Sequence, residues 1–167
     1  IRTRNMDDDR KRNAPKWQRV VKTVDWVSTQ LPITSQYQMW NFSTEYESVL
    51  PGTEDRWLEV ADRDQLNQVI ERGNDIVPNN GTNMAQVFRA VANMSPRPDN
   101  IFLITDGLPT QGATPAKASL VTAKDLLKLF QSAMSVVNLS IPINVILFPM
   151  EGDPIASPSY WRLAQIT

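Results

Sequence analysis

The sequence predicts an α/β protein with a doubly wound, mostly parallel sheet that carries helices on both faces. Two observations favour this fold class. Short apolar runs of strand length alternate with longer segments whose apolar residues recur every three or four positions. The run at 101–104 is continuously apolar, which is typical of a strand buried on both faces of a parallel sheet. This alternation predicts right-handed crossovers between neighbouring parallel strands.

The composition limits the classes of function. The chain has 167 residues, of which 41% are apolar and 21% are charged, as expected for one globular domain. Its net charge of −1 gives no electrostatic basis for binding nucleic acid. The absence of Cys and His excludes disulfides, thiolate chemistry and every Ser-His or Cys-His catalytic arrangement. No apolar run approaches the roughly 20 residues that span a bilayer, so we expect no membrane insertion by this segment.

In the first half of the chain, apolar spacing and turn residues set the expected elements. Pro32 stops a helical pattern, Pro51 and Gly52 close a hairpin arm, and Asp64 and Gly73 suit the two ends of a short helix. The expected order is a polar N-terminal segment without regular structure at 1–15, a helix at 16–31, strands at 37–42, 46–50 and 56–61, and a helix at 64–73. We assign 1–15 as a separate polar segment and 16–167 as one domain.

The second half repeats the alternation of helices and strands. A helix is expected to start at 81–83, and a final one to be capped by Ser157, with Pro158 in its first turn. Between them, the patterns predict a strand at 101–104, a long helix at 117–137 and a buried strand at 143–148.

Polar residues follow the strand at 101–104 directly. Thr105 and Asp106 come at its end, and Gly107 turns the chain away. Ligands of open α/β sheets bind beyond the carboxyl ends of the strands. The helix that starts at Thr82 leads back into this strand and should bring Thr82 near Asp106. Hydroxyl and carboxylate oxygens are hard ligands that suit Mg2+ or Mn2+.

Simpler roles also fit these residues. Asp106 before Gly107 is a common turn pair, and Thr82 suits the N-cap of its helix. Asn83 is expected to be a turn residue. Glu151 and Asp153 follow the strand at 143–148, and we expect them to lie in a solvated loop.

The stretch Gly81-Thr82-Asn83, followed after a helix by DNIFLITDGLPT at 99–110, resembles the second half of a von Willebrand factor type A (VWA) domain. The resemblance covers most of the chain and implies a Rossmann-like fold with a metal-ion-dependent adhesion site. In that family, a Thr and an Asp at the positions of Thr82 and Asp106 are metal ligands. The family's Asp-x-Ser-x-Ser motif, which ends the central strand, does not occur here. We therefore expect a partial domain whose central strand is supplied by another chain or segment.

The resemblance implies a protein-binding module in which the cation accepts an acidic group of a partner protein. With two ligands, this fragment should bind Mg2+ or Mn2+ weakly or not at all. Trp26, off the main apolar stripe of its helix, is a candidate partner contact. One alternative is a metal-free assembly scaffold of the same fold. Another is a Mg-dependent hydrolase or phosphoryl-transfer enzyme, but neither a phosphate-binding Gly-rich loop nor a nucleophile elbow is present. The resemblance also favours an extracytoplasmic or cell-envelope location.

Overall fold

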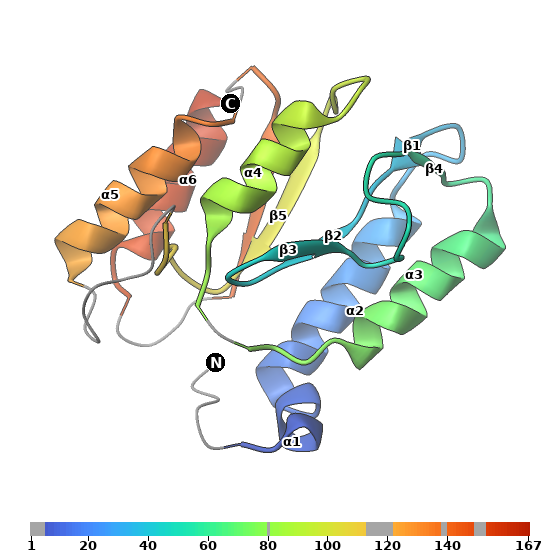
Figure 1. Cartoon of the computed structure of the whole chain (residues 1–167), viewed down its shortest axis with the longest axis horizontal. Helices are drawn as coiled ribbons and strands as arrows, with labels where there is room; N and C mark the ends of the chain where they lie inside the picture. The colour runs from blue at the N-terminus through green and yellow to red at the C-terminus, as the bar shows by residue number, and fades with distance from the viewer. Residues whose placement is uncertain (1–5, 80, 113–121, 138–139, 149–152) are drawn as a thin grey trace. The chain divides into compact units, whose positions relative to one another are not determined.

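A computed structural model describes residues 6–79, 81–112, 122–137, 140–148 and 153–167 (Figure 1). Within these ranges the protein is mixed α/β, with six helices and three two-stranded sheets, one of them parallel. The predicted α/β class is confirmed at this level. The chain divides into two compact units: Ile1–Asn41 with Glu47–Asn79, and Phe42–Tyr46 with Asn80–Thr167.

The first unit contains a small core built from its short strands, their connections and one helix. Its core residues are Tyr37, Val49, Leu58, Val60, Leu66 and Val69. β1 and β4 pair antiparallel, with Tyr37 opposite Leu58. β2 and β3 form a hairpin whose tip belongs to the second unit. The elements are α1 (Asp8–Arg12), α2 (Pro15–Thr29), β1 (Gln36–Tyr37), β2 (Trp40–Phe42), β3 (Tyr46–Ser48), β4 (Leu58–Glu59) and α3 (Arg63–Asp75).

Three expectations for this unit were wrong in detail. The polar segment at 1–15 contains a helix, α1, because the Asp7 side chain accepts a hydrogen bond from the Arg10 N–H (2.8 Å) and caps it. The strand expected at 37–42 is split into β1 and β2. Between them, the Gln38 side chain donates hydrogen bonds to the carbonyl oxygens of Thr53 and Arg56.

The third difference concerns the ends of α3. Its N-cap is Asp62 and not Asp64, since the Asp62 carboxylate accepts from the Gln65 N–H at 3.0 Å. The helix also continues through Gly73 to Asp75. A glycine weakens a helix without ending it, so sequence alone sets such a boundary only to within a turn.

The second unit holds the parallel pair of strands. It comprises α4 (Met84–Asn93), β5 (Ile101–Thr105), α5 (Ala123–Met134), β6 (Ile143–Leu147) and α6 (Ala156–Ile166). β5 and β6 run side by side in register from Ile101 opposite Ile143 to Thr105 opposite Leu147 (Figure 1). α4 packs against α5, and α6 packs against β6. Both predicted strands and all three helices are therefore present.

Burial and caps differ from expectation in this unit. β5 was predicted to be buried on both faces, but only Leu103 is fully buried and Phe102 is 45% exposed. Within the described ranges, β6 is the only strand that pairs with β5. α6 begins one residue before Ser157, which lies inside the helix and does not cap it. α5 begins with a capping box made by Thr122 and Asp125, and the earlier start expected at 117 lies outside the described residues.

Candidate site at the carboxyl ends of the parallel strands

Asp106 lies where the sequence predicted it, directly after the carboxyl end of β5. β5 ends at Thr105, whose carbonyl oxygen accepts a hydrogen bond from the Phe148 N–H (2.8 Å) just beyond β6. The two parallel strands thus end at the same edge. Asp106 is partly buried there. In α/β sheets, ligands bind at this edge.

The peptide group that joins Gly107 to Leu108 is held from both sides. Its carbonyl oxygen accepts hydrogen bonds from the Tyr160 hydroxyl (2.8 Å) and the Thr105 hydroxyl (3.2 Å). Its N–H, on Leu108, donates to Oδ2 of Asp153 at 2.9 Å. A peptide group is planar, so these bonds fix its rotation and constrain the backbone that follows Asp106. We call Thr105, Tyr160 and Asp153, with this peptide group, the peptide clamp.

Thr82 is joined to the other end of the same loop. Its N–H donates to the Thr110 hydroxyl at 2.9 Å, and its carbonyl oxygen accepts from the N–H groups of Thr110 and Gln111, both at 3.0 Å. The structure therefore brings Thr82 onto the loop that begins at Asp106. All three hydrogen bonds are made by the backbone N–H and carbonyl oxygen of Thr82. They do not involve the Thr82 hydroxyl.

Close backbone approach explains the glycine before Thr82. A Cβ atom at Gly81 would lie 2.6 Å from the Thr110 hydroxyl oxygen and 2.9 Å from Nε2 of Gln111. Such distances are well inside van der Waals contact. Gly81 thus allows the segment at 81–83 to lie against the loop at 110–112.

Asn83 occupies the N-cap position of α4, which the sequence had assigned to Thr82. The Asn83 side chain is 4% exposed, and its Nδ2 donates to the Gly112 carbonyl oxygen at 3.1 Å. Its Oδ1 has no hydrogen-bond partner within the described part of the chain, and it makes no cap bond there. Asn83 is therefore a buried residue beside the loop, and not only a turn residue.

Tyr160 is a site residue that the sequence did not indicate. It is 2% exposed, and its ring meets Phe130 edge-on with centroids 5.2 Å apart. Burial raises the pKa of the Tyr160 phenol well above its ordinary value. A hydrogen bond with Thr105 opposes this rise in pKa, whereas the carboxylates of Asp153 and Asp106 add to it. The phenol therefore remains a hydrogen-bond donor at neutral pH.

The expectation that Asp153 lies in a solvated loop was wrong. Asp153 is partly buried, and its Oδ2 is engaged by the Leu108 N–H. Oδ1 is buried too, and no described residue supplies a hydrogen bond to it. The parallel pairing of β5 and β6 helps to explain this position, because the two strands end at the same edge and Asp153 follows β6 in the chain. Glu151, paired with Asp153 in the sequence argument, lies outside the described residues.

Oxygen atoms of the kind that suits a hard divalent cation occur on the segments hydrogen-bonded to the loop at 106–112 and on the loop itself. They include the carboxylate of Asp106, the hydroxyl of Thr82, and the side-chain oxygens of Asn83 and Asp153. Two of them, Oδ1 of Asp153 and Oδ1 of Asn83, are buried without a partner among the described residues. In the described ranges, there is no group of three or more His, Cys, Asp or Glu side chains that could hold a metal ion. A cation held by Asp106 would therefore take its other ligands from hydroxyl, amide and water oxygens.

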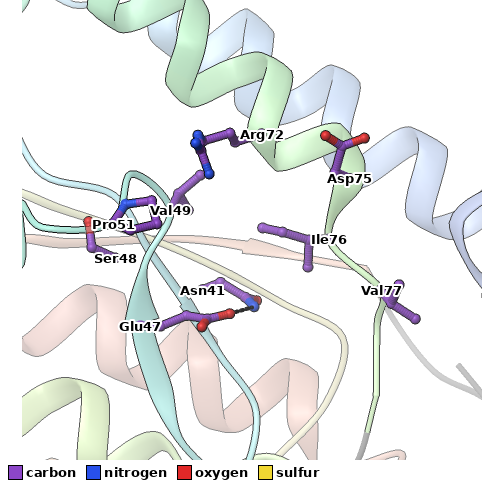
Figure 2. A pocket seen from close by; sticks show the side chains of 9 residues that line it. All are labelled: Asn41, Glu47, Ser48, Val49, Pro51, Arg72, Asp75, Ile76 and Val77. Carbon is purple, nitrogen blue, oxygen red and sulfur yellow. Dashed lines mark hydrogen bonds between the residues drawn. The ribbon is translucent and has the colours of Figure 1, made fainter.

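A separate cavity of about 350 Å³ lies in the first unit (Figure 2). Glu47 and Asn41 hydrogen-bond at 3.4 Å on one side of it, and Arg72 and Asp75 come from the last turn of α3. Because charges of both signs line it, the cavity favours neither an anionic nor a cationic ligand. Its lining is Asn41, Glu47, Ser48, Val49, Pro51, Arg72, Asp75, Ile76 and Val77.

Comparison of the chain with models of protein families, with curated proteins and with solved structures finds no match. Of the helices in the described ranges, none has both the length and the apolar character needed to cross a membrane. Function is therefore inferred from the site residues.

Proposed function

We propose that the chain is part of a VWA-like protein-binding module, in which a divalent cation at the strand ends recognises an acidic group on a partner protein. One observation carries the proposal. Asp106 follows the carboxyl end of a parallel strand, and the Thr82 segment is hydrogen-bonded to the loop that Asp106 begins. These are the two segments that hold ligands in the family that the sequence resembles.

In this proposal, Asp106 and Thr82 hold Mg2+ or Mn2+ through a carboxylate and a hydroxyl oxygen. The bound cation supplies the positive charge that a partner's carboxylate meets. The chain's own residues position these ligands: the peptide clamp fixes the turn after Asp106, and bonds to Thr110 and Gln111 fix Thr82. The role is recognition and not catalysis, because the chain offers no His or Cys as a base or nucleophile.

One edge of β5 has no partner strand among the described residues, and this supports a partner strand as the second part of the proposal. The Ile101 N–H donates to the Pro142 carbonyl oxygen, and the Thr105 carbonyl oxygen accepts from Phe148, so these residues face β6. In a parallel ladder, the intervening Phe102 and Ile104 present their backbone groups to the other edge. We propose that a strand from another chain or segment pairs with that edge, completes a Rossmann-like doubly wound sheet and brings further metal ligands.

Titration with Mn2+ tests the metal site, because the ion broadens NMR signals of nearby nuclei. In 15N-labelled protein at millimolar Mn2+, we expect selective broadening of the amides of Thr82 and of residues 105–107. Asp106→Ala should abolish this broadening. Asp99→Ala removes an exposed carboxylate before the other end of β5 and should leave it unchanged. Broadening spread over exposed carboxylates, or none at Asp106, would refute the proposed site.

A further inference from the structure

We propose that Asp153 is a positioning residue that holds Asp106 in the geometry for binding a cation. The proposal rests on the proposed function and adds to it a residue that is remote in sequence. Asp153 lies 45 residues from Leu108 along the chain, in the segment between β6 and α6. The hydrogen bond from Leu108 nevertheless places Asp153 at the turn that follows Asp106.

The argument starts from the backbone of this turn. Gly107, next to Asp106, has no Cβ and leaves its peptide groups free to rotate. Tyr160 and Thr105 hold the carbonyl side of the Gly107–Leu108 peptide group, and Asp153 alone among the clamp residues holds its N–H side. Without an acceptor at Asp153, the peptide group would be held from one side only. The backbone that follows Asp106 would then sample more than one orientation.

The chemistry of the Asp153 bond suits this role. A carboxylate that accepts from a backbone N–H makes a charge-assisted hydrogen bond, stronger than a neutral one. Residues of this kind, which orient a metal ligand without touching the metal, typically change metal affinity by about 10- to 100-fold when they are replaced. Oδ1 of Asp153 is buried and has no hydrogen-bond partner in the described ranges. Asp153 can thus act on the site in two ways, through the position of its acceptor oxygen and through the negative charge of its carboxylate.

A pair of substitutions separates position from charge. Asp153→Asn keeps an acceptor oxygen at the same distance along the side chain and removes the charge. Asp153→Glu keeps the charge and displaces the acceptor by one methylene. Asp153→Asn is nearly isosteric and Asp153→Glu adds one methylene, so neither variant leaves a cavity. The measurement is the Mn2+ affinity of each variant, from free Mn2+ in electron paramagnetic resonance.

If Asp153 acts by position, we expect Asp153→Glu to bind Mn2+ about 10-fold more weakly than the wild type. Asp153→Asn should stay within about 3-fold of the wild type. The proposal would be overturned if Asp153→Asn bound Mn2+ more weakly than Asp153→Glu, or if both variants bound it as tightly as the wild type. Exchange of the Leu108 amide hydrogen, measured without metal, should be faster in Asp153→Glu than in Asp153→Asn.

The two readouts distinguish the two proposals. If the wild type binds no Mn2+ while the Leu108 amide responds as expected, the two ligands of this chain do not hold the cation by themselves and the role of Asp153 here is reduced to holding the turn. If the wild type binds Mn2+ but neither the affinity nor the Leu108 amide distinguishes the variants, the positioning role fails and the proposed function stands.

Discussion

Single residues from distant parts of the chain converge on the turn after Asp106. Tyr160 and Asp153 reach it from 53 and 45 residues further along the chain. Their polar atoms are buried, so each hydrogen bond replaces solvation that the folded protein has removed. The buried phenol is the clearest case, because it must stay protonated to donate to Gly107.

We predict that Tyr160→Phe lowers stability by about 1 kcal/mol at pH 7, since one buried hydrogen bond is lost while Thr105 still donates to Gly107. The pKa of Tyr160 is raised in the folded state, so its contribution is complete below the unfolded pKa of about 10 and is lost as pH rises above it. Urea unfolding from pH 7 to 11 should therefore show a steeper loss of stability above pH 10 in the wild type than in the variant. Tyr46→Phe, at a residue 39% exposed, is the control and should resemble the wild type.

At this scale the sequence predicted some residues of the candidate site and not others. Thr82 and Asp106 could be found because each stands at the end of a recognisable element. Tyr160 and Asp153 could not, because their roles depend on which strands are neighbours and in what register. A buried Tyr in an apolar helical pattern has the same sequence signature whether or not its hydroxyl has a partner.

At the scale of elements, patterns predicted which segments are helices and strands better than where they end. Apolar periodicity predicted α2, α4 and α5, and Pro158 in the first turn indicated α6. α4 and α5 bury apolar residues at this spacing, whereas Ser28 is the fully buried residue of α2. The end of a helix depends instead on one or two hydrogen bonds, and several acidic residues often compete for them. In α3 the sequence suggested Asp64 as the cap, and the hydrogen bond from the Gln65 N–H shows that the cap is Asp62.

Substitution of Asp62 and of Asp64 gives a matched test of which residue caps α3. Asp62→Ala should destabilise the protein by about 1 kcal/mol, because it removes the side-chain cap of α3. Asp64→Ala also removes a negative charge near the start of the same helix but no cap bond, so we expect a cost of only a few tenths of a kcal/mol. The midpoints of urea unfolding would measure both. Equal losses would show that charge, and not the cap bond, stabilises this end of α3.

On the scale of the whole molecule, the division into two units was not evident from the sequence. No Pro- or Gly-rich linker marks it, and the boundary is crossed within the β2–β3 hairpin. Each unit has buried residues of its own, such as Leu66 in the first and Met84 in the second. Which buried residues pack together in one unit depends on tertiary structure, and the periodicity of apolar residues does not show it.

The division predicts separable unfolding. Leu66→Ala should destabilise the first unit by about 2–5 kcal/mol through the cavity it leaves. Four of the five Trp residues (Trp17, Trp26, Trp40 and Trp57) lie in this unit, so the urea midpoint of Trp fluorescence should fall. Protection of the β5 and β6 amides from hydrogen exchange should change little. An equal loss of protection in both units would mean that they unfold as one.

If a strand of another chain or segment pairs with the edge of β5 that no described strand occupies, as proposed above, the pairing has a consequence for the amount of functional protein in a cell. An edge strand has room for one neighbour, so a completing strand and a second copy of the chain would compete for the same place. Chains made before the partner strand is present would pair with one another through β5. Such pairs could not bind the partner strand. The ratio of the two components, and the order in which they are made, would then limit how much binding-competent protein forms.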